Sequence, residues 1–372
     1  MKNFWKKLNK PFFCLAPMAD VTDCAFRKII SKYGKPDVFW TEFVSADGLA
    51  HKDARKKLLI DLSYSKKEHP IVAQIFGSNP ENIKKAAALC KKLGFDGIDI
   101  NMGCPDRSIE KQHSGAAMIK NPELAKEIIK STKEEAGGLP VSVKTRIGYH
   151  SVDMGWIKNL LGEDISALTV HLRTRKEMSK VPAHWDLMKE IVDMRNKIAP
   201  DTLIIGNGDV LDIKDAKEKA KETGCDGVML GRAIFGNPWL FANLAHIRIC
   251  DCQIEHPVSN SFLNVSQSKN NYRKINSFAT QSRNSAEHSE CVAHKKTHEF
   301  ETGMNIKIRL KILVEHTKLF EKYLGGIKSF DVMKKHFKAY VNGFDGAKEL
   351  RTKLMETKNA KEVEKIIKEF LK

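Results

Sequence analysis

The sequence has eight cysteines but no Cys-x-x-Cys pair, and its closest couple is Cys250 with Cys252. Scattered cysteines of this kind do not form a disulfide framework, and their spacing matches no regular zinc arrangement. We therefore expect reduced thiols, no bound metal and a cytoplasmic location.

A long hydrophobic run is also missing from the sequence. A membrane-spanning helix needs about 20 apolar residues, and no stretch approaches that length. The basic N-terminus is followed by an apolar run over residues 12–19, which Pro17 interrupts and Asp20 ends. We interpret this run as a buried strand rather than a signal peptide, and we expect no membrane partner.

Acidic residues are in deficit, because 46 Asp and Glu stand against 63 Lys and Arg, which gives a formal net charge of +17. A surplus of this size indicates a polyanionic partner, either a nucleic acid or an anionic membrane surface.

A short apolar, β-rich run followed by a longer helical stretch recurs up to residue 244. The runs cover residues 12–18, 37–44, 70–77, 97–103, 141–147, 167–174, 202–209 and 227–235. Asn79-Pro80 and Asn121-Pro122 each place an N-cap residue before a proline at the first helical position. Such alternation implies parallel strands, and eight units fit an α/β fold of the closed (β/α)₈ TIM-barrel type. The alternative, an open doubly wound sheet, normally carries a Gly-x-Gly-x-x-Gly turn after its first strand, and that turn is absent here.

The amino-acid composition changes after the last repeat. Residues 245–302 are rich in Ser, Asn, Gln and His, which predicts a disordered insertion. The helical period returns in four segments over residues 303–372, where Lys and Arg outnumber Asp and Glu by 17 to 9. We therefore predict a barrel domain over 1–244, an insertion over 245–302 and a small basic helical bundle over 303–372.

Reactive side chains of a barrel lie at the C-terminal ends of its strands. Cys104 follows the fourth run between Gly103 and Pro105, where a thiol can act as nucleophile or general acid, although a buried structural cysteine is the alternative. Lys144 in the fifth run needs an anionic or carbonyl partner, such as the N1–C2=O edge of a flavin. His171 and Arg173 follow in the sixth run, where His171 is either functional or a satisfied core histidine.

Glycines follow the last two runs. Gly208 lies between Asn207 and Asp209, and Gly231 precedes Arg232. Barrels commonly build a phosphate site after these two strands, from backbone N–H groups and basic side chains. The residues alone thus predict a barrel that binds a phosphorylated planar cofactor, with a reactive cysteine facing it.

These segments resemble the tRNA-dihydrouridine synthase family, and most nearly its bacterial members. The matching segments follow the family's order and include APMADVTDCAFR, VAQIFG, DINMGCP, VKTRIGY, GNGDV and GRAIFGNPW. The segment KKHFKAYVNGFDGAKELR is similar to the family's helical tRNA-binding domain. One departure is Leu172, because the family usually has glycine between the histidine and arginine of this motif.

The resemblance implies an enzyme that reduces the C5–C6 bond of specific tRNA uridines, with bound FMN and with NADPH or NADH as reductant. Cys104 matches the catalytic acid, Asn101 would lie between flavin and substrate, and Arg173 would stabilise charge on the substrate carbonyl. The cofactor-binding residues that it implies are Pro17, Met18, Ala19, Gln74, Lys144, His171, Asn207, Gly208, Asp209, Gly231 and Arg232. We further expect a monomer whose partner is tRNA.

Two other function classes stay open on the sequence. One is an FMN-dependent barrel oxidoreductase that acts on a small molecule, similar to dihydroorotate dehydrogenases, although this class does not explain the basic helical tail. The other is a non-catalytic RNA-binding protein on a degenerate barrel, against which the Cys, Lys and glycine positions argue.

Overall fold

The computed structural model describes residues 3–242 and 306–372 of the chain. The residues up to Ala242 and those from Arg309 onwards form one compact unit. The predicted insertion over 245–302 lies outside the described residues.

Parallel strands form one sheet that closes on itself. The strands are β1 (Phe12–Leu15), β2 (Phe39–Trp40), β3 (Val44–Ser45), β4 (Ile71–Phe76), β5 (Gly97–Met102), β6 (Val141–Arg146), β7 (Ala167–His171), β8 (Leu203–Asn207) and β9 (Gly227–Leu230). Their order is β1-β9-β8-β7-β6-β5-β4-β2, with β3 also paired to β4. A bridge between Cys14 and Val38 joins the two ends of this order. The predicted (β/α)₈ barrel is therefore confirmed.

The second predicted run, 37–44, is split into the short strands β2 and β3. Thr41 lies between them, and its N–H still donates to Val72 O at 3.0 Å. The N–H of Gln74, however, donates to the side-chain Oγ1 of Thr41 at 3.0 Å instead of to a carbonyl. This side-chain acceptor interrupts the backbone ladder, which is why one apolar run yields two strands.

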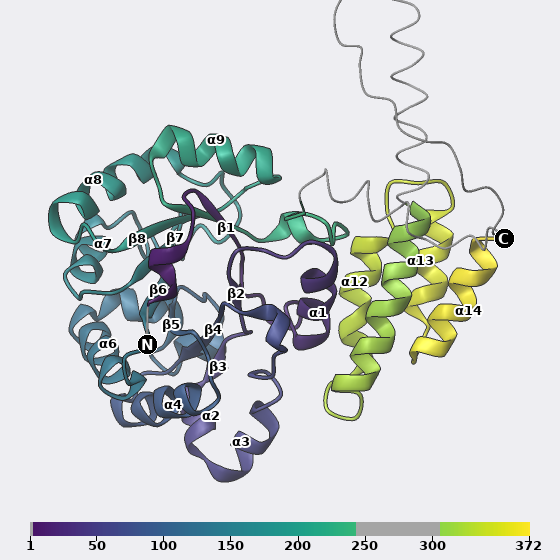
Figure 1. The fold of residues 1–372 in the computed structure, drawn as a ribbon, viewed down its shortest axis with the longest axis horizontal. Helices are drawn as coiled ribbons and strands as arrows, with labels where there is room; N and C mark the ends of the chain where they lie inside the picture. Colours follow the sequence, from purple (N-terminus) through teal and green to yellow (C-terminus); the bar gives the residue numbers. More distant parts are fainter. Residues whose placement is uncertain (1–2, 243–305) are drawn as a thin grey trace, which may run out of the picture. The chain divides into compact units, whose positions relative to one another are not determined.

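Helices connect successive strands and surround the sheet (Figure 1). They are α1 (Cys24–Tyr33), α2 (Ala46–Ala50), α3 (Lys52–Leu58), α4 (Pro80–Lys92), α5 (Arg107–Glu110), α6 (Pro122–Ala136), α7 (Met154–Leu161), α8 (Met188–Ile198) and α9 (Ile213–Thr223). The predicted helix starts are confirmed: Asn79 caps α4 and Asn121 caps α6, each accepting backbone N–H bonds at its side-chain oxygen.

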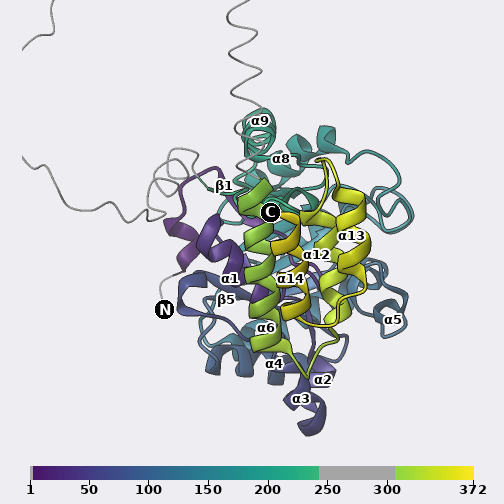
Figure 2. The ribbon, with the colours of Figure 1, turned by 90° about the vertical axis from the view of Figure 1, so that its right-hand side faces the viewer.

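The described C-terminal residues are helical in the four predicted segments. A helix runs through residues 306–324, and it is followed by α12 (Met333–Tyr340), α13 (Ala347–Met355) and α14 (Ala360–Phe370). Figure 2 shows these last three helices side by side. The ring of Phe26 on α1 packs against His316 and His336, at centroid distances of 5.3 and 4.9 Å. Of the helices in the described residues, none has the length and apolar character needed to span a bilayer.

Candidate active site

The inner face of the barrel changes from apolar to polar along the strands. Val72, Ala167 and Leu203 belong to the buried apolar cluster of the interior. Alternate residues of a strand share one face, so the same face continues into polar side chains nearer the C-terminal ends. The predicted site residues on this face are Gln74, Asn101, Lys144, His171 and Asn207. Cross-strand register places Asn101 beside Lys144 and His171 beside Asn207.

Cys104 lies just after β5 and is half-buried. Its N–H donates to Asn101 Oδ1 at 2.9 Å, and its carbonyl accepts from Ala116 N at 2.9 Å. Gly115, at a φ of +62°, packs so closely that a Cβ there would lie 2.7 Å from Cys104 O. Burial raises the pKa of the Cys104 thiol, and the nearby charges of Arg146 and Lys144 offset this only in part. The thiol therefore keeps its proton at neutral pH, as a proton donor must.

Lys144 reaches across the mouth of the barrel from β6 to β8. Its Nζ donates to Asn207 Oδ1 at 3.2 Å, which is its one hydrogen bond within residues 3–242 and 306–372. Burial and then repulsion from Arg146 lower the pKa of Lys144 to about 8. Because an ammonium carries three N–H donors, Lys144 has donors left for an anionic or carbonyl ligand.

Asp209 forms ion pairs with Arg173, which follows β7, and with Arg232, which follows β9. One of its carboxylate oxygens accepts from Arg173 and from Ala183 N, the latter at 2.9 Å, and the other accepts from Arg232 at 2.5 Å. The hydrogen bond from Arg173 holds the pKa of Asp209 below its ordinary value. Burial, followed by the charges of Lys144 and Arg146, lowers the pKa of His171 well below its ordinary value, so this ring is neutral. The cluster keeps a surplus of positive charge.

Arg173 is buried within this cluster rather than exposed at the rim. Its guanidinium also donates to Val181 O at 2.6 Å and lies 3.3 Å from His171 Nε2. Its donors are therefore largely occupied by the protein.

The chain after β1 borders Gly231, which directly follows the last strand, β9. Pro17 and Met18 are half-buried, and Ala19 is exposed. A Cβ built on Gly231 would meet nothing closer than Ala16 Cβ at 3.8 Å and Met18 Sδ at 4.0 Å. The open side of Gly231 thus faces the segment after β1, where the family resemblance implies flavin contacts.

Gly208 is required by the backbone after β8. Its φ of +132° is a conformation that L side chains rarely adopt, and a Cβ there would lie 2.8 Å from Ala183 Cβ. Glycine therefore lets the chain turn beside His171 and leads directly into Asp209.

Cys104 also lines a cavity of about 550 Å³. The other lining residues are Pro105, Asp106, Arg107, Arg175, Lys176, Met178 and Lys180. Four of these are basic and one is acidic, and Arg175 is held by an ion pair with Glu110. The sequence analysis predicted no role for these basic lining residues. The run of basic residues after the sixth predicted strand, which includes Arg175, Lys176 and Lys180, could have indicated them.

Arg146 is a further residue to which sequence reasoning gives no role. It lies on the same inner face as Lys144, two residues on, and donates to Gly103 O at 2.8 Å and Thr174 O at 3.2 Å. Burial lowers the pKa of Arg146 to about 10. Arg146 thus ties the Cys104 segment to the segment after β7.

Leu172, where the resemblance led us to expect glycine, is fully buried in the cluster between sheet and helices. Its N–H donates to Asn207 O at 2.9 Å, and its carbonyl accepts from His184 N at 2.8 Å. The side chain therefore points away from the barrel mouth that His171 lines.

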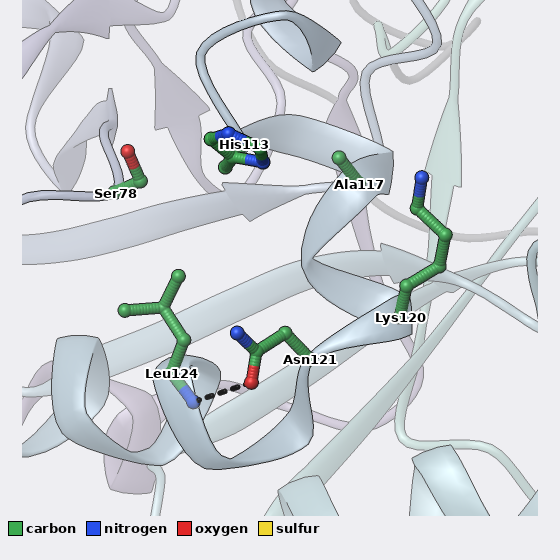
Figure 3. A pocket seen from close by; sticks show the side chains of 6 residues that line it. All are labelled: Ser78, His113, Ala117, Lys120, Asn121 and Leu124. Carbon is green, nitrogen blue, oxygen red and sulfur yellow. Dashed lines mark hydrogen bonds between the residues drawn. The ribbon is translucent and has the colours of Figure 1, made fainter.

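Figure 3 shows a second cavity, of about 640 Å³. Its lining residues are Ser78, His113, Ala117, Lys120, Asn121 and Leu124. None of these is a site residue predicted from the sequence.

A family model described as dihydrouridine synthase matches residues 14–296. A probable tRNA-dihydrouridine synthase of Staphylococcus aureus (strain Mu50 / ATCC 700699) is 39% identical over 99% of this chain and 96% of its own length. A probable tRNA-dihydrouridine synthase 2 of Bacillus subtilis (strain 168) is 38% identical over 99% of this chain and 97% of its own.

Among solved structures, morphinone reductase matches with a TM-score of 0.47 and 15% identity, over 66% of this chain and 88% of its own. This likeness is too low to bear on function. The family model and the two bacterial relatives do bear on it, and they agree with the resemblance seen in the motifs. The chain belongs to the dihydrouridine synthase family of enzymes.

Proposed function

We propose that this chain reduces the C5–C6 double bond of specific uridines in tRNA to 5,6-dihydrouridine, with FMN as cofactor and NADPH or NADH as reductant. The observation that carries the proposal is the position of Cys104. Cys104, whose thiol is protonated, lines a basic cavity, and this thiol lies within the electrostatic influence of Lys144, which belongs to the polar inner face of the barrel. The names of the relatives support tRNA as the substrate.

The residues present fit FMN. The unneutralised charge around Asp209 and the open side of Gly231 suit a phosphate, to which Arg232 and backbone N–H groups after β8 and β9 would donate. The spare donors of Lys144 suit the N1–C2=O edge of the ring, and Gln74, His171 and Asn207 lie on the same inner face. Pro17, Met18 and Ala19 would contact the ring through their backbone. When bound and reduced, FMN supplies the hydride that is added at C6 of uracil.

The chain's own residues would bind the base and supply the proton. Uracil must leave the base stack to reach the barrel mouth. Asn101 would lie beside it, and Cys104 would give its proton to C5 on the face opposite the hydride. Arg173 would stabilise charge on the substrate side, acting through Asp209 and His171, because most of its own donors are occupied. Arg107, Lys176 and Lys180 would contact RNA phosphates.

The proposal includes the division of the chain predicted from the sequence, with a barrel domain over residues 1–244 and a helical tRNA-binding domain over residues 303–372. The barrel would hold the cofactor, and the basic helices after residue 303 would bind tRNA phosphates. A protein truncated after residue 244 should then lose tRNA binding, whereas an enzyme acting on a small molecule would keep its substrate.

The test is dihydrouridine formation in an unmodified tRNA transcript, measured by mass spectrometry of nucleosides. Cys104→Ala should keep FMN but lose at least about 100-fold in turnover, because general acid catalysis contributes roughly 10²–10⁴-fold. As a control, Cys225→Ala removes a buried thiol that lies just before the N-terminal end of β9, away from the strand ends that carry the site. This variant should keep near-normal turnover. Normal turnover by Cys104→Ala would rule out its role as proton donor.

A further inference from the structure

A buried chain of hydrogen bonds runs from the Cys104 segment into the barrel. The N–H groups of Gly103 and Cys104 donate to Asn101 Oδ1 at 3.1 and 2.9 Å. Asn101 Nδ2 donates to Gln74 Oε1 at 3.0 Å, and Gln74 Nε2 donates to Asp99 Oδ2 at 2.6 Å. Hydrogen bonds thus link Asp99, Gln74 and Asn101, on the neighbouring strands β4 and β5, to the segment that holds Cys104.

The direction of this chain is fixed by its two ends. A backbone N–H can only donate, so the oxygen of the Asn101 amide must face the Cys104 segment. The amide nitrogen of Asn101 then faces Gln74, whose oxygen must accept and whose nitrogen must donate onward. The last group has to be an acceptor, and that group is Asp99. A donor at this position would force one of the two amides to turn over and leave a buried N–H unpaired.

Asp99 itself is held in place to serve as this acceptor. It is fully buried on β5, and its second oxygen accepts from Ser142 Oγ at 2.6 Å across the β5–β6 pair. Burying a carboxylate is costly unless it is hydrogen-bonded and compensated. Burial raises the pKa of Asp99 to about 6, while the two hydrogen bonds and the charge of Lys144 work in the opposite direction. At neutral pH the group is therefore an ionised acceptor.

We propose that Asp99 is a positioning residue, which orients the Gln74 and Asn101 amides and through them holds in place the Cys104 segment that lines the basic cavity. The inference rests on the proposed role of Cys104 as proton donor. Asp99 touches neither substrate nor cofactor in this assignment. Its effect passes through two amides to the backbone of the reacting residue.

Two substitutions separate the acceptor from the rest of the side chain. In Asp99→Asn, the side-chain oxygen can still accept from Gln74, and the side-chain nitrogen can donate to Ser142 Oγ. The hydroxyl proton of Ser142 can then turn to Ile98 O, which lies 3.5 Å from Ser142 Oγ. In Asp99→Leu, the acceptor is lost. Thr169→Val is the matched control, because Thr169 Oγ1 is buried in the same barrel and has no hydrogen-bond partner in the described part of the chain.

The first readout is the rate at which iodoacetamide alkylates Cys104 in flavin-free, full-length protein, followed by mass spectrometry of the Cys104 peptide. Asp99→Leu should change this rate at least fivefold, whereas Asp99→Asn and Thr169→Val should stay within twofold of wild type. If Asp99→Leu does not fold, Gln74→Leu breaks the same chain one link on and should show the same change.

The second readout is the split between kcat and KM on the tRNA transcript with saturating FMN and NADPH. Asp99→Leu should lose about 100-fold in kcat with little change in KM, since small misplacements of reacting groups cost about this much. Asp99→Asn should recover most of that loss. Wild-type alkylation and kcat in a folded Asp99→Leu protein would overturn the inference, and so would an Asp99→Asn protein as defective as Asp99→Leu. Absence of dihydrouridine formation by the wild type would instead count against the proposed function, while the alkylation comparison would still test Asp99.

Discussion

Glu42 Oε2 lies 3.0 Å from Nζ of Lys328, which is 286 residues away in sequence. Lys328 also lies 2.9 Å from Asp61 Oδ1, and the other oxygen of Glu42 accepts from the N–H of Asp20 at 2.5 Å. Burial alone would lower the pKa of Lys328, but Glu42 and Asp61 outweigh it and raise the pKa. One lysine thus supplies the counter-charge for Glu42 and Asp61 beside the segment proposed to contact the flavin, while burial raises the pKa of Glu42 to about 7.

Replacing Lys328 with Met should destabilise the protein by about 3 kcal/mol, because it leaves the buried carboxylate of Glu42 without its counter-charge. Lys335, which is half exposed and lies 3.5 Å from Asp20, is the control. Its replacement with Met should cost less than about 1 kcal/mol, as for other surface ion pairs. Urea unfolding of the three proteins measures both values, and equal losses would contradict this account.

The buried pair His316 and His336 should make the protein sensitive to acid. Burial lowers the pKa of His336 to about 3 and that of His316 well below its ordinary value. Both rings stay neutral in the folded state, whereas in the unfolded state they take up protons below about pH 6.5. Stability is therefore complete above that pH and is lost as the pH falls from about 6.5 towards 3, by about 1.4 kcal/mol per pH unit for each ring.

Replacing His336 with Phe keeps an aromatic ring against Phe26 but removes the titrating group. Between pH 7.5 and 5.5 the variant should lose about 1.4 kcal/mol less stability than wild type in urea unfolding. If wild type and variant lose the same free energy of unfolding between pH 7.5 and 5.5, His336 is not the source of the acid sensitivity.

Flavin affinity should depend on the charge of Lys144. Its pKa of about 8 means that the ammonium is present below pH 8 and is lost as the pH rises through that value. FMN affinity, measured by quenching of flavin fluorescence, should weaken above pH 8 in wild type. Lys144→Met should bind FMN more weakly at pH 7 and show little further change up to pH 9. The same pH dependence in wild type and variant would remove Lys144 from the flavin site.

The basic cavity beside Cys104 should contribute to tRNA binding through counterion release. Lys180→Met should weaken tRNA binding and reduce the slope of log K against log salt concentration by about 0.7–0.9, the amount expected for one phosphate contact. Lys217→Met removes the same charge from the exposed side of α9 and should leave the slope unchanged. Filter binding at several salt concentrations distinguishes them, and FMN affinity should be normal in both.

The order of motifs along the chain was enough to predict the barrel and the strand ends that carry its polar residues. Alternating short apolar runs and capped helices have few other solutions, and inward-facing residues follow from the two-residue period of a strand. For this reason Lys144, His171 and Asn207 could be named from the strand pattern, whereas Gln74 and Asn101 were named from the family resemblance, and all five lie on one inner face. The split of the second strand could not be foreseen, because it depends on which acceptor the N–H of Gln74 finds in space.

Sequence by itself determined the fold class and the family and pointed to Cys104 as the candidate proton donor, since these depend on local patterns and on motif order. Only the tertiary structure decided the partners: Asp209 with Arg173 and Arg232, Lys144 with Asn207, and Asp99 at the end of the line that leads to Cys104. These pairs join different strands, so they exist only once the barrel has closed. An aspartate within the run Gly97–Met102 has no local feature that reveals its partners, because hydrogen-bond direction is set by geometry across strands and not by neighbours along the chain.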